Sequence, residues 1–145
     1  MKRLYTLALT LAAIAFSTIA IAQNPATLPR KIESGPYKAG HIQGIAVDAE
    51  QRYIYYSYTT MLIKTDMQGN IVGTVTGLLG HLGDLGFNNE DGRLYGSLEY
   101  KNDAIGQGIL RMEKSSRKLQ NAFYIAIFDV DKITREGMDA EKDGI

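Results

Sequence analysis

Short apolar and aromatic runs, separated by polar turns, follow one another along the chain from residue 40 onward. The first four cover residues 44–48, 53–58, 60–66 and 71–76. Runs of this length, rich in tyrosine, isoleucine, valine and threonine, are typical of β-strands. The glycine and asparagine within residues 67–70 favour a hairpin turn between the last two runs. The pattern therefore predicts four antiparallel strands within residues 40–79.

This unit has a second copy 40 residues further along the chain. The copies begin at Gly40-His41 and Gly80-His81, and the pairs Glu50/Glu90, Tyr55/Tyr95 and Ser57/Ser97 follow without a gap. A repeat of roughly 40–50 residues built from four short strands is typical of a β-propeller blade. We therefore predict an all-β fold class, with one propeller blade at residues 40–79 and a second, incomplete at its C-terminus, at residues 80–145.

The second copy contains an insertion after Glu99. The pattern resumes at residues 122–129, at an offset of 63 instead of 40, so the insert is about 23 residues long and occupies roughly residues 101–120. We expect a short extra strand at residues 109–112 and an exposed polar connection at residues 113–120. Insertions in repeat proteins map to loops on one face, often the binding face.

Residues 1–22 have the organisation of a signal peptide. Lys2 and Arg3 precede an apolar run that ends in Ala20-Ile21-Ala22, the small-residue pattern that signal peptidase reads. We predict cleavage after Ala22 and a secreted or periplasmic bacterial protein with no stable membrane insertion after cleavage, and we interpret residues 23–39 as a linker or outer strand. The alternative is an uncleaved membrane anchor, since about 20 apolar residues span a bilayer.

The remaining composition narrows the choice of compartment and partner. The chain has no cysteine, so no disulfide framework exists, and export without disulfides fits a bacterial periplasm. Removal of Lys2 and Arg3 leaves 14 basic residues against 16 acidic ones, a net charge of −2. Lys114, Arg117 and Lys118 form the one tight basic cluster, which we interpret as a solvated loop. The composition argues against nucleic-acid binding.

The first copy resembles the blades of a known superfamily. Residues 44–48, 53–56 and 62–72 are similar to the blade pattern of NHL-repeat and related six-bladed propellers, the group that includes gluconolactonase-like and strictosidine-synthase-like proteins. The NHL pattern usually has Pro-x-Gly where this chain has residues 41–44. In enzymes of this group the resemblance implies a metal at the channel mouth, held by acidic and amide side chains from several blades. With two copies in view, no such set is carried over to this chain.

β-Propellers close with roughly four to eight blades, and residues 23–145 hold fewer than three. Two interpretations stay open. The chain is either an N-terminal piece of a longer propeller or a small unit that closes by forming an oligomer.

Five polar side chains are candidates for ligand binding: His41, Gln43, His81, Asp84 and Glu99. Equivalent positions at the start of innermost strands lie at the same end of a propeller channel, so both histidines are expected there. A neutral imidazole can bind a ligand or a metal, but a histidine repeated in each blade also fits a packing role. Gln43 and Asp84 differ between the copies, as a specific site requires, and Glu99 begins the insertion.

Residues 139–144 resemble the first half of a calcium loop, with alternating oxygen ligands and a glycine in sixth place. Calcium is therefore the divalent cation that we consider as a cofactor, and an acidic turn is the alternative. No catalytic motif occurs in the sequence. We predict a secreted module that binds a small molecule, a glycan or a protein at the channel mouth. The alternative is a metal-dependent hydrolase of the lactonase or esterase type.

Overall fold

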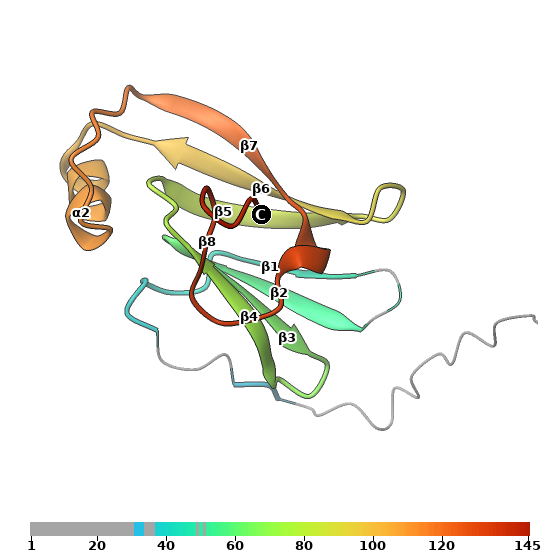
Figure 1. The fold of residues 1–145 in the computed structure, drawn as a ribbon. Coiled ribbons are helices and arrows are strands. Elements are labelled where there is room, and N and C mark those ends of the chain that lie inside the picture. Colours follow the sequence, from blue (N-terminus) through green and yellow to red (C-terminus); the bar gives the residue numbers. More distant parts are fainter. Residues whose placement is uncertain (1–30, 34–36, 49, 51) are drawn as a thin grey trace, which may run out of the picture.

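The structure, a computed structural model, describes residues 31–33, 37–48, 50 and 52–145 (Figure 1). The predicted signal peptide, with its cleavage site after Ala22, lies outside the described residues, as does most of the predicted linker at residues 23–39. No helix in the described part of the chain is long and apolar enough to cross a membrane.

The first copy of the repeat forms an antiparallel meander of four strands in chain order. These are β1 (Gly44–Val47), β2 (Tyr53–Tyr58), β3 (Met61–Asp66) and β4 (Ile71–Thr76). A short strand, β8 (Met138–Asp139), adds to β4 in the parallel direction. We call this five-stranded sheet sheet A. Its first four strands confirm the four that the sequence predicted.

The second copy forms a three-stranded antiparallel sheet, sheet B, in the order β5-β6-β7. Its strands are β5 (His81–Asn88), β6 (Arg93–Tyr100) and β7 (Ala122–Phe128). The fold is therefore all-β, as predicted, and the two sheets do not close on each other.

The insertion contains a helix, α2 (Ala104–Met112), so the strand expected at residues 109–112 is wrong. The Asp103 side chain caps the helix N-terminus by accepting hydrogen bonds from two backbone N–H groups. The buried residues Gly106, Ile109 and Leu110 stand at helical spacing. The run 109–112 is too short to show this period, and the cap at Asp103 is the signal in the sequence that marks the helix.

Strand register confirms both offsets of the repeat. Tyr55 of β2 lies opposite Lys64 of β3, and Tyr95 of β6 lies opposite Ile127 of β7. These pairs are related by offsets of 40 on one strand and 63 on the other. The pairing of β1 with β2 is repeated in β5 and β6 at an offset of 40, since Ala46 faces Tyr55 and Gly86 faces Tyr95.

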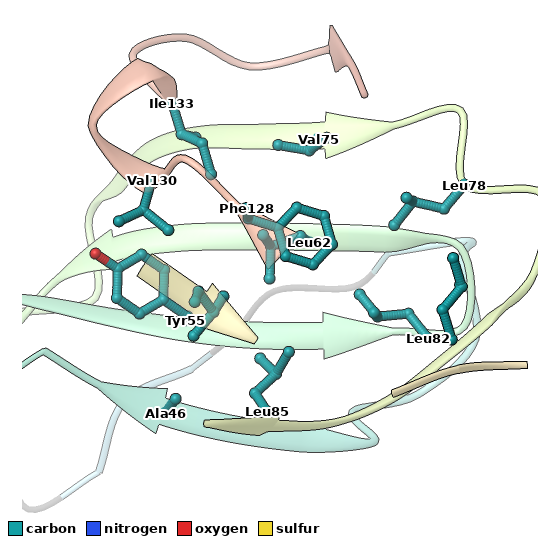
Figure 2. Packing of buried hydrophobic residues seen from close by; sticks show 12 residues of the cluster. Ala46, Tyr55, Leu62, Val75, Leu78, Leu82, Leu85, Phe128, Val130 and Ile133 are labelled. Carbon is teal, nitrogen blue, oxygen red and sulfur yellow. The ribbon is translucent and has the colours of Figure 1, made fainter. Parts of the chain in front are cut away.

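The main core lies between the two sheets. Side chains of both sheets point toward each other in Figure 2, and the cluster includes Tyr55, Leu62 and Val75 from sheet A and Leu85 and Phe128 from sheet B. The Tyr55 ring stacks on Phe87, with ring centroids 5.9 Å apart.

A second cluster covers the opposite face of sheet A. Tyr56, Tyr58 and Ile63 point into it, and Tyr37 packs on Tyr58 with ring centroids 5.5 Å apart. Sheet B has no equivalent cover among the described residues: β7 runs along the outer rim of the molecule (Figure 1).

Residues 130–145 return from β7 to sheet A through a single helical turn, η2 (Val130–Lys132). The buried Lys64 fixes this return, because its Nζ donates hydrogen bonds to the carbonyl oxygens of Val130, at 2.8 Å, and Ile133, at 3.4 Å. The ammonium also lies 4.2 Å from the centre of the Tyr53 ring. Burial lowers the Lys64 pKa, although Asp131 opposes that shift.

Candidate functional site

The starts of β1 and β5 lie against each other, so the two repeated headings are at the same end of the sheets. A Cβ placed on Gly44 would be 2.8 Å from both the Asp84 Cα and the Leu85 backbone nitrogen. Glycine is therefore required for this approach at Gly44. The contact brings Gln43, which precedes Gly44, to the same end as Asp84, as the sequence predicted for the two headings.

Two hydrogen bonds join the sheets at this end. The Ser57 hydroxyl donates to the Gly83 carbonyl, and the Leu82 backbone N–H donates to the Thr59 carbonyl at 2.9 Å. The register of β5 on β6 shifts between Leu82 and Leu85, as in a β-bulge. The bulge places Asp84 on the surface, where its carboxylate accepts a hydrogen bond from the Leu85 N–H.

His41 and Gln43 form one pair of the predicted site residues. Their side-chain nitrogens, Nε2 in both, are 3.1 Å apart, and His41 is exposed. The Gln43 backbone N–H donates to the Ser57 carbonyl at 2.9 Å, which fixes the backbone of this pair at the start of β1.

His81 and Glu99 form a second pair, on neighbouring strands of sheet B. They are direct partners in the register of β5 and β6. Glu99 Oε2 also lies 2.9 Å from Lys101 Nζ, and this hydrogen bond raises the Lys101 pKa. The structure thus places the five predicted residues in two polar groups near one end of the sheets, with His81 and Glu99 in one and His41, Gln43 and Asp84 in the other.

The insertion folds tightly onto the end of β6. A Cβ on Gly106 would overlap the carbonyl oxygen of Lys101, so α2 passes directly against the chain that enters it. The Thr60 hydroxyl donates to Met112 Sδ at 3.7 Å, which links the far end of α2 to the β2–β3 turn. Figure 1 shows α2 beyond the ends of β6 and β7.

A pocket of about 380 Å³ is formed by this insertion. Its lining combines amides, hydroxyls, two leucines and three cationic side chains: Asn102, Gln107, Leu110, Arg111, Ser115, Ser116, Arg117, Lys118 and Leu119. All nine residues fall between 102 and 119, and none of them is acidic. The pocket therefore belongs to the segment that distinguishes the second copy from the first.

The loop that follows α2 is held by a Schellman turn. Ser115 N–H donates to the Leu110 carbonyl at 2.9 Å, and Lys114 N–H donates to the Arg111 carbonyl at 3.2 Å. Lys114 adopts a φ of 51°, in the left-handed region where glycine is preferred. The turn directs Ser115 and Ser116 to the pocket wall.

Arg117 is the one cation of the pocket with a carboxylate partner among the described ion pairs. Its Nη1 lies 2.7 Å from Glu141 Oε1, and this hydrogen bond raises the Arg117 pKa. The contact joins the pocket to the C-terminal segment. Arg111 and Lys118 contribute further positive charge to the lining.

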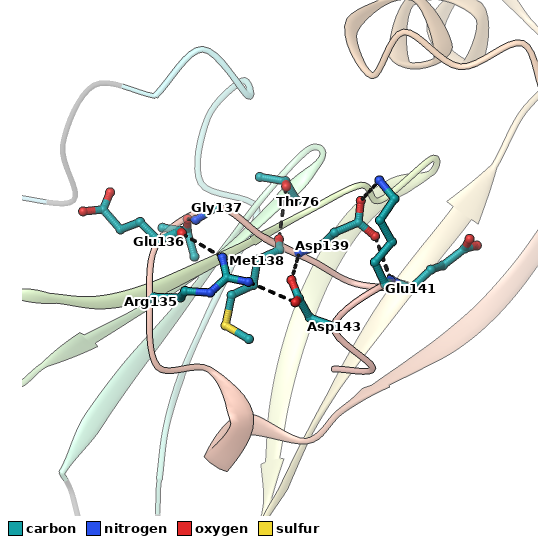
Figure 3. Close-up of polar contacts among 10 residues, drawn as sticks. Thr76, Arg135, Glu136, Gly137, Met138, Asp139, Glu141 and Asp143 are labelled. Carbon is teal, nitrogen blue, oxygen red and sulfur yellow. Dashed lines mark hydrogen bonds and ion pairs between the residues drawn. The ribbon is translucent and has the colours of Figure 1, made fainter.

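The acidic turn at residues 139–144 uses its oxygens internally (Figure 3). Asp139 Oδ1 accepts hydrogen bonds from the backbone N–H groups of Glu141 and Lys142, and Asp139 Oδ2 pairs with Lys142 Nζ. Asp143 accepts from the Asp139 N–H and pairs with Arg135. This arrangement is that of the acidic turn, the alternative to calcium. Among the described residues, no three His, Asp or Glu side chains are grouped so as to hold a metal ion.

Sequence reasoning identifies the insertion but misses the pocket residues within it. The cluster that contains Arg117 and Lys118 predicts a solvated loop, since a charge cluster in a polar segment is usually that. Arg111 and Gln107 lie on the helix that the sequence analysis did not predict. A correctly predicted helix would have shown that Arg111, in its last turn, is followed by two serines and two further cations.

Comparisons with protein-family models, with curated proteins and with solved structures find no match to this chain.

Proposed function

We propose that the chain is a ligand-binding module of the propeller-repeat type and that its ligand is a small acidic molecule, such as an acidic sugar. The pocket within the insertion carries this proposal, because its lining combines Arg111, Arg117 and Lys118 with no carboxylate. Guanidinium groups bind carboxylates and phosphates through paired hydrogen bonds.

The other lining groups suit a polyhydroxylated ligand. Ser115 and Ser116 offer hydroxyls that donate and accept, and Asn102 and Gln107 offer amides, which already bond each other at 2.8 Å. Leu110 and Leu119 supply an apolar floor. A few convergent polar groups around an apolar surface are typical of small-molecule sites.

The propeller-repeat part of the proposal rests on the equal register of the two sheets. Each copy is a meander, and both copies begin at the same end. In a propeller this end surrounds the channel mouth, where the predicted residues His41, Gln43, His81, Asp84 and Glu99 would border the ligand. The insertion would then stand beside that mouth, where loops between strands carry binding function. Secretion after cleavage at Ala22 stays part of the same proposal.

A matched pair of sugars tests the ligand class. Glucuronate and glucose differ in carboxylate and charge, so binding is compared by isothermal titration calorimetry at low and high salt. We expect glucuronate to bind more tightly than glucose and its affinity to fall as salt is added, since exposed charges are screened.

Variants locate the binding. Arg111→Gln is expected to reduce glucuronate affinity by roughly tenfold to a hundredfold, because a charged hydrogen bond contributes on the order of 1.5–3 kcal/mol. Arg93→Gln removes a cation at the opposite end of β6 and should leave the affinity unchanged. Equal affinity for the two sugars, or equal loss in both variants, would refute the acidic-ligand proposal.

A further inference from the structure

Exposed large apolar side chains of the strands form two surfaces on opposite sides of the molecule's sheet pair. On sheet B, Phe123, Ile125 and Ile127 of β7 are 74%, 72% and 48% exposed. On sheet A, Ile45 and Val47 of β1 are 56% and 41% exposed. Contiguous apolar patches of this kind mark interaction surfaces.

The repeat offset shows what the β1 surface corresponds to. Ile45 and Val47 occupy the positions of Leu85 and Phe87 in the second copy. Leu85 and Phe87 belong to or pack on the core cluster, and Phe87 stacks on Tyr55. The exposed pair on β1 is therefore equivalent to a pair that makes the interface between the sheets.

The open face of sheet B, defined as Tyr95, Ser97, Phe123, Ile125 and Ile127, corresponds to the other half of the same interface. Tyr95 occupies the position of Tyr55, and Ile125 occupies the position of Leu62. Leu62 is 0% exposed, and both Tyr55 and Leu62 receive the packing of sheet B. The two exposed surfaces are thus the two halves of an interface that the molecule already contains.

Polar groups repeat the same relation. Inside the molecule the Ser57 hydroxyl donates to the Gly83 carbonyl. The equivalent positions, at an offset of 40, are Ser97 on the open face and Gln43 at the start of β1. A second interface of the same kind would place the Ser97 hydroxyl against the Gln43 carbonyl.

We propose that a second copy of this chain covers the open face of sheet B with the β1 side of its sheet A, head to tail. Continuity with the internal interface is the main argument. Charge agrees with it, because neither residues 42–47 nor the open face include an aspartate, glutamate, lysine or arginine. At the edge of that face Glu99 is already paired with Lys101. The contact therefore brings no like charges together.

The segment before β1 sets the extent of the contact. Tyr37 and Ala39 cover Tyr58 and its neighbours on the β3 side of sheet A, and they leave Ile45 and Val47 open. Docking therefore uses the β1 side. A head-to-tail contact that repeats can close into a ring, and with two sheets in each copy about two to four copies make up a ring of propeller size.

Cysteine cross-linking tests the contact, since the chain has no cysteine of its own. Full-length Ser97→Cys and Gln43→Cys variants with tags of different mass are mixed and treated with a short bismaleimide. Packed sheets lie about 10 Å apart, within reach of such a linker. We expect a mixed product that joins one Ser97→Cys chain to one Gln43→Cys chain, and little product from either variant alone.

Two further substitutions separate this contact from others. Ile125→Lys in the Ser97→Cys chain places a charge in the proposed interface and should lower the yield of the mixed product about tenfold or more. Ile105→Lys on α2, where Ile105 is 58% exposed and off the face, should leave the yield unchanged. A mixed product that survives Ile125→Lys, a Ser97→Cys product with itself, or the absence of any cross-link would each overturn the proposal.

Discussion

Sheets A and B have the same order of strands and the same register, yet their matching faces have opposite surroundings. Leu62 in sheet A is 0% exposed, and its counterpart in sheet B, Ile125, is 72% exposed. Tyr55 is buried and stacked, whereas Tyr95 is half-buried and bonds its hydroxyl to Asp91. Register and residue type are therefore properties of the repeat, while burial depends on whether a neighbouring sheet is present.

The largest expected effect concerns the matched pair Leu62 and Ile125. Leu62→Ala removes a fully buried side chain, so we expect the free energy of unfolding to fall by about 2–5 kcal/mol. Ile125→Ala, at a concentration where copies stay apart, should change it by about 0.5 kcal/mol or less. Urea unfolding followed by circular dichroism measures both. Similar losses in the two variants would show that the faces are not differently covered.

Glycines give the next largest contrast. Gly44→Ala forces a methyl against the backbone of Asp84 and Leu85, and overpacking of this kind costs about 1–3 kcal/mol. Gly86 occupies the position of Ala46, and a Cβ there meets nothing within 4 Å. Gly86→Ala should therefore raise stability by about 0.4–1 kcal/mol, through the unfolded chain. Thermal melts of both variants check this, and a destabilised Gly86→Ala variant would contradict the equivalence.

Lys64 and Ile127 share a position but differ in chemistry, and pH distinguishes them. Burial lowers the folded-state pKa of Lys64, so between that pKa and the ordinary value near 10.4 the unfolded chain binds more protons. Stability contributed by this group therefore rises as pH increases through that window. We expect wild type to gain stability relative to Lys64→Met between pH 7 and pH 10. A constant difference in unfolding free energy would show that the Lys64 pKa is not lowered.

The smallest effect concerns the insertion, which sheet A lacks. Lys114 holds a left-handed conformation at the end of α2. Lys114→Gly should raise stability by roughly 0.5–1 kcal/mol because glycine adopts this conformation without steric cost. The substitution of the neighbouring Glu113, which has a φ of −82°, by glycine should lower it. Scanning calorimetry that ranks the two variants in the opposite order would argue against the Schellman turn.

The first sheet is predicted nearly completely from the sequence because its strands are local hairpins with clear turn residues. The strands expected at residues 53–58 and 71–76 match β2 and β4. The offset of 63 also locates β7 and its register. Local periodicity is sufficient for these elements, since each is paired with its neighbour in the chain.

Other features depend on contacts that no local pattern records. The pairing of β8 with β4 joins Met138 to Val75 across the whole second copy. The helix α2 escapes prediction because its apolar face is short and interrupted by glycines, and with it the pocket at Arg111. The five predicted site residues, His41, Gln43, His81, Asp84 and Glu99, do lie near one end of the sheets, but whether they bind a ligand stays a prediction.

The equivalence of the two sheets requires that β7 pairs with β6 in the register in which β3 pairs with β2. Backbone nuclear Overhauser effects in the folded protein test this register directly. We predict cross-strand contacts between Tyr95 and Ile127 and between Tyr55 and Lys64, with Ile125 opposite Ser97. A shift of one residue moves every side chain of a strand to the other face. Contacts of Tyr95 with Phe128 or Ala126 as its direct partner would place Ile125 and Ile127 in the core and contradict the equivalence.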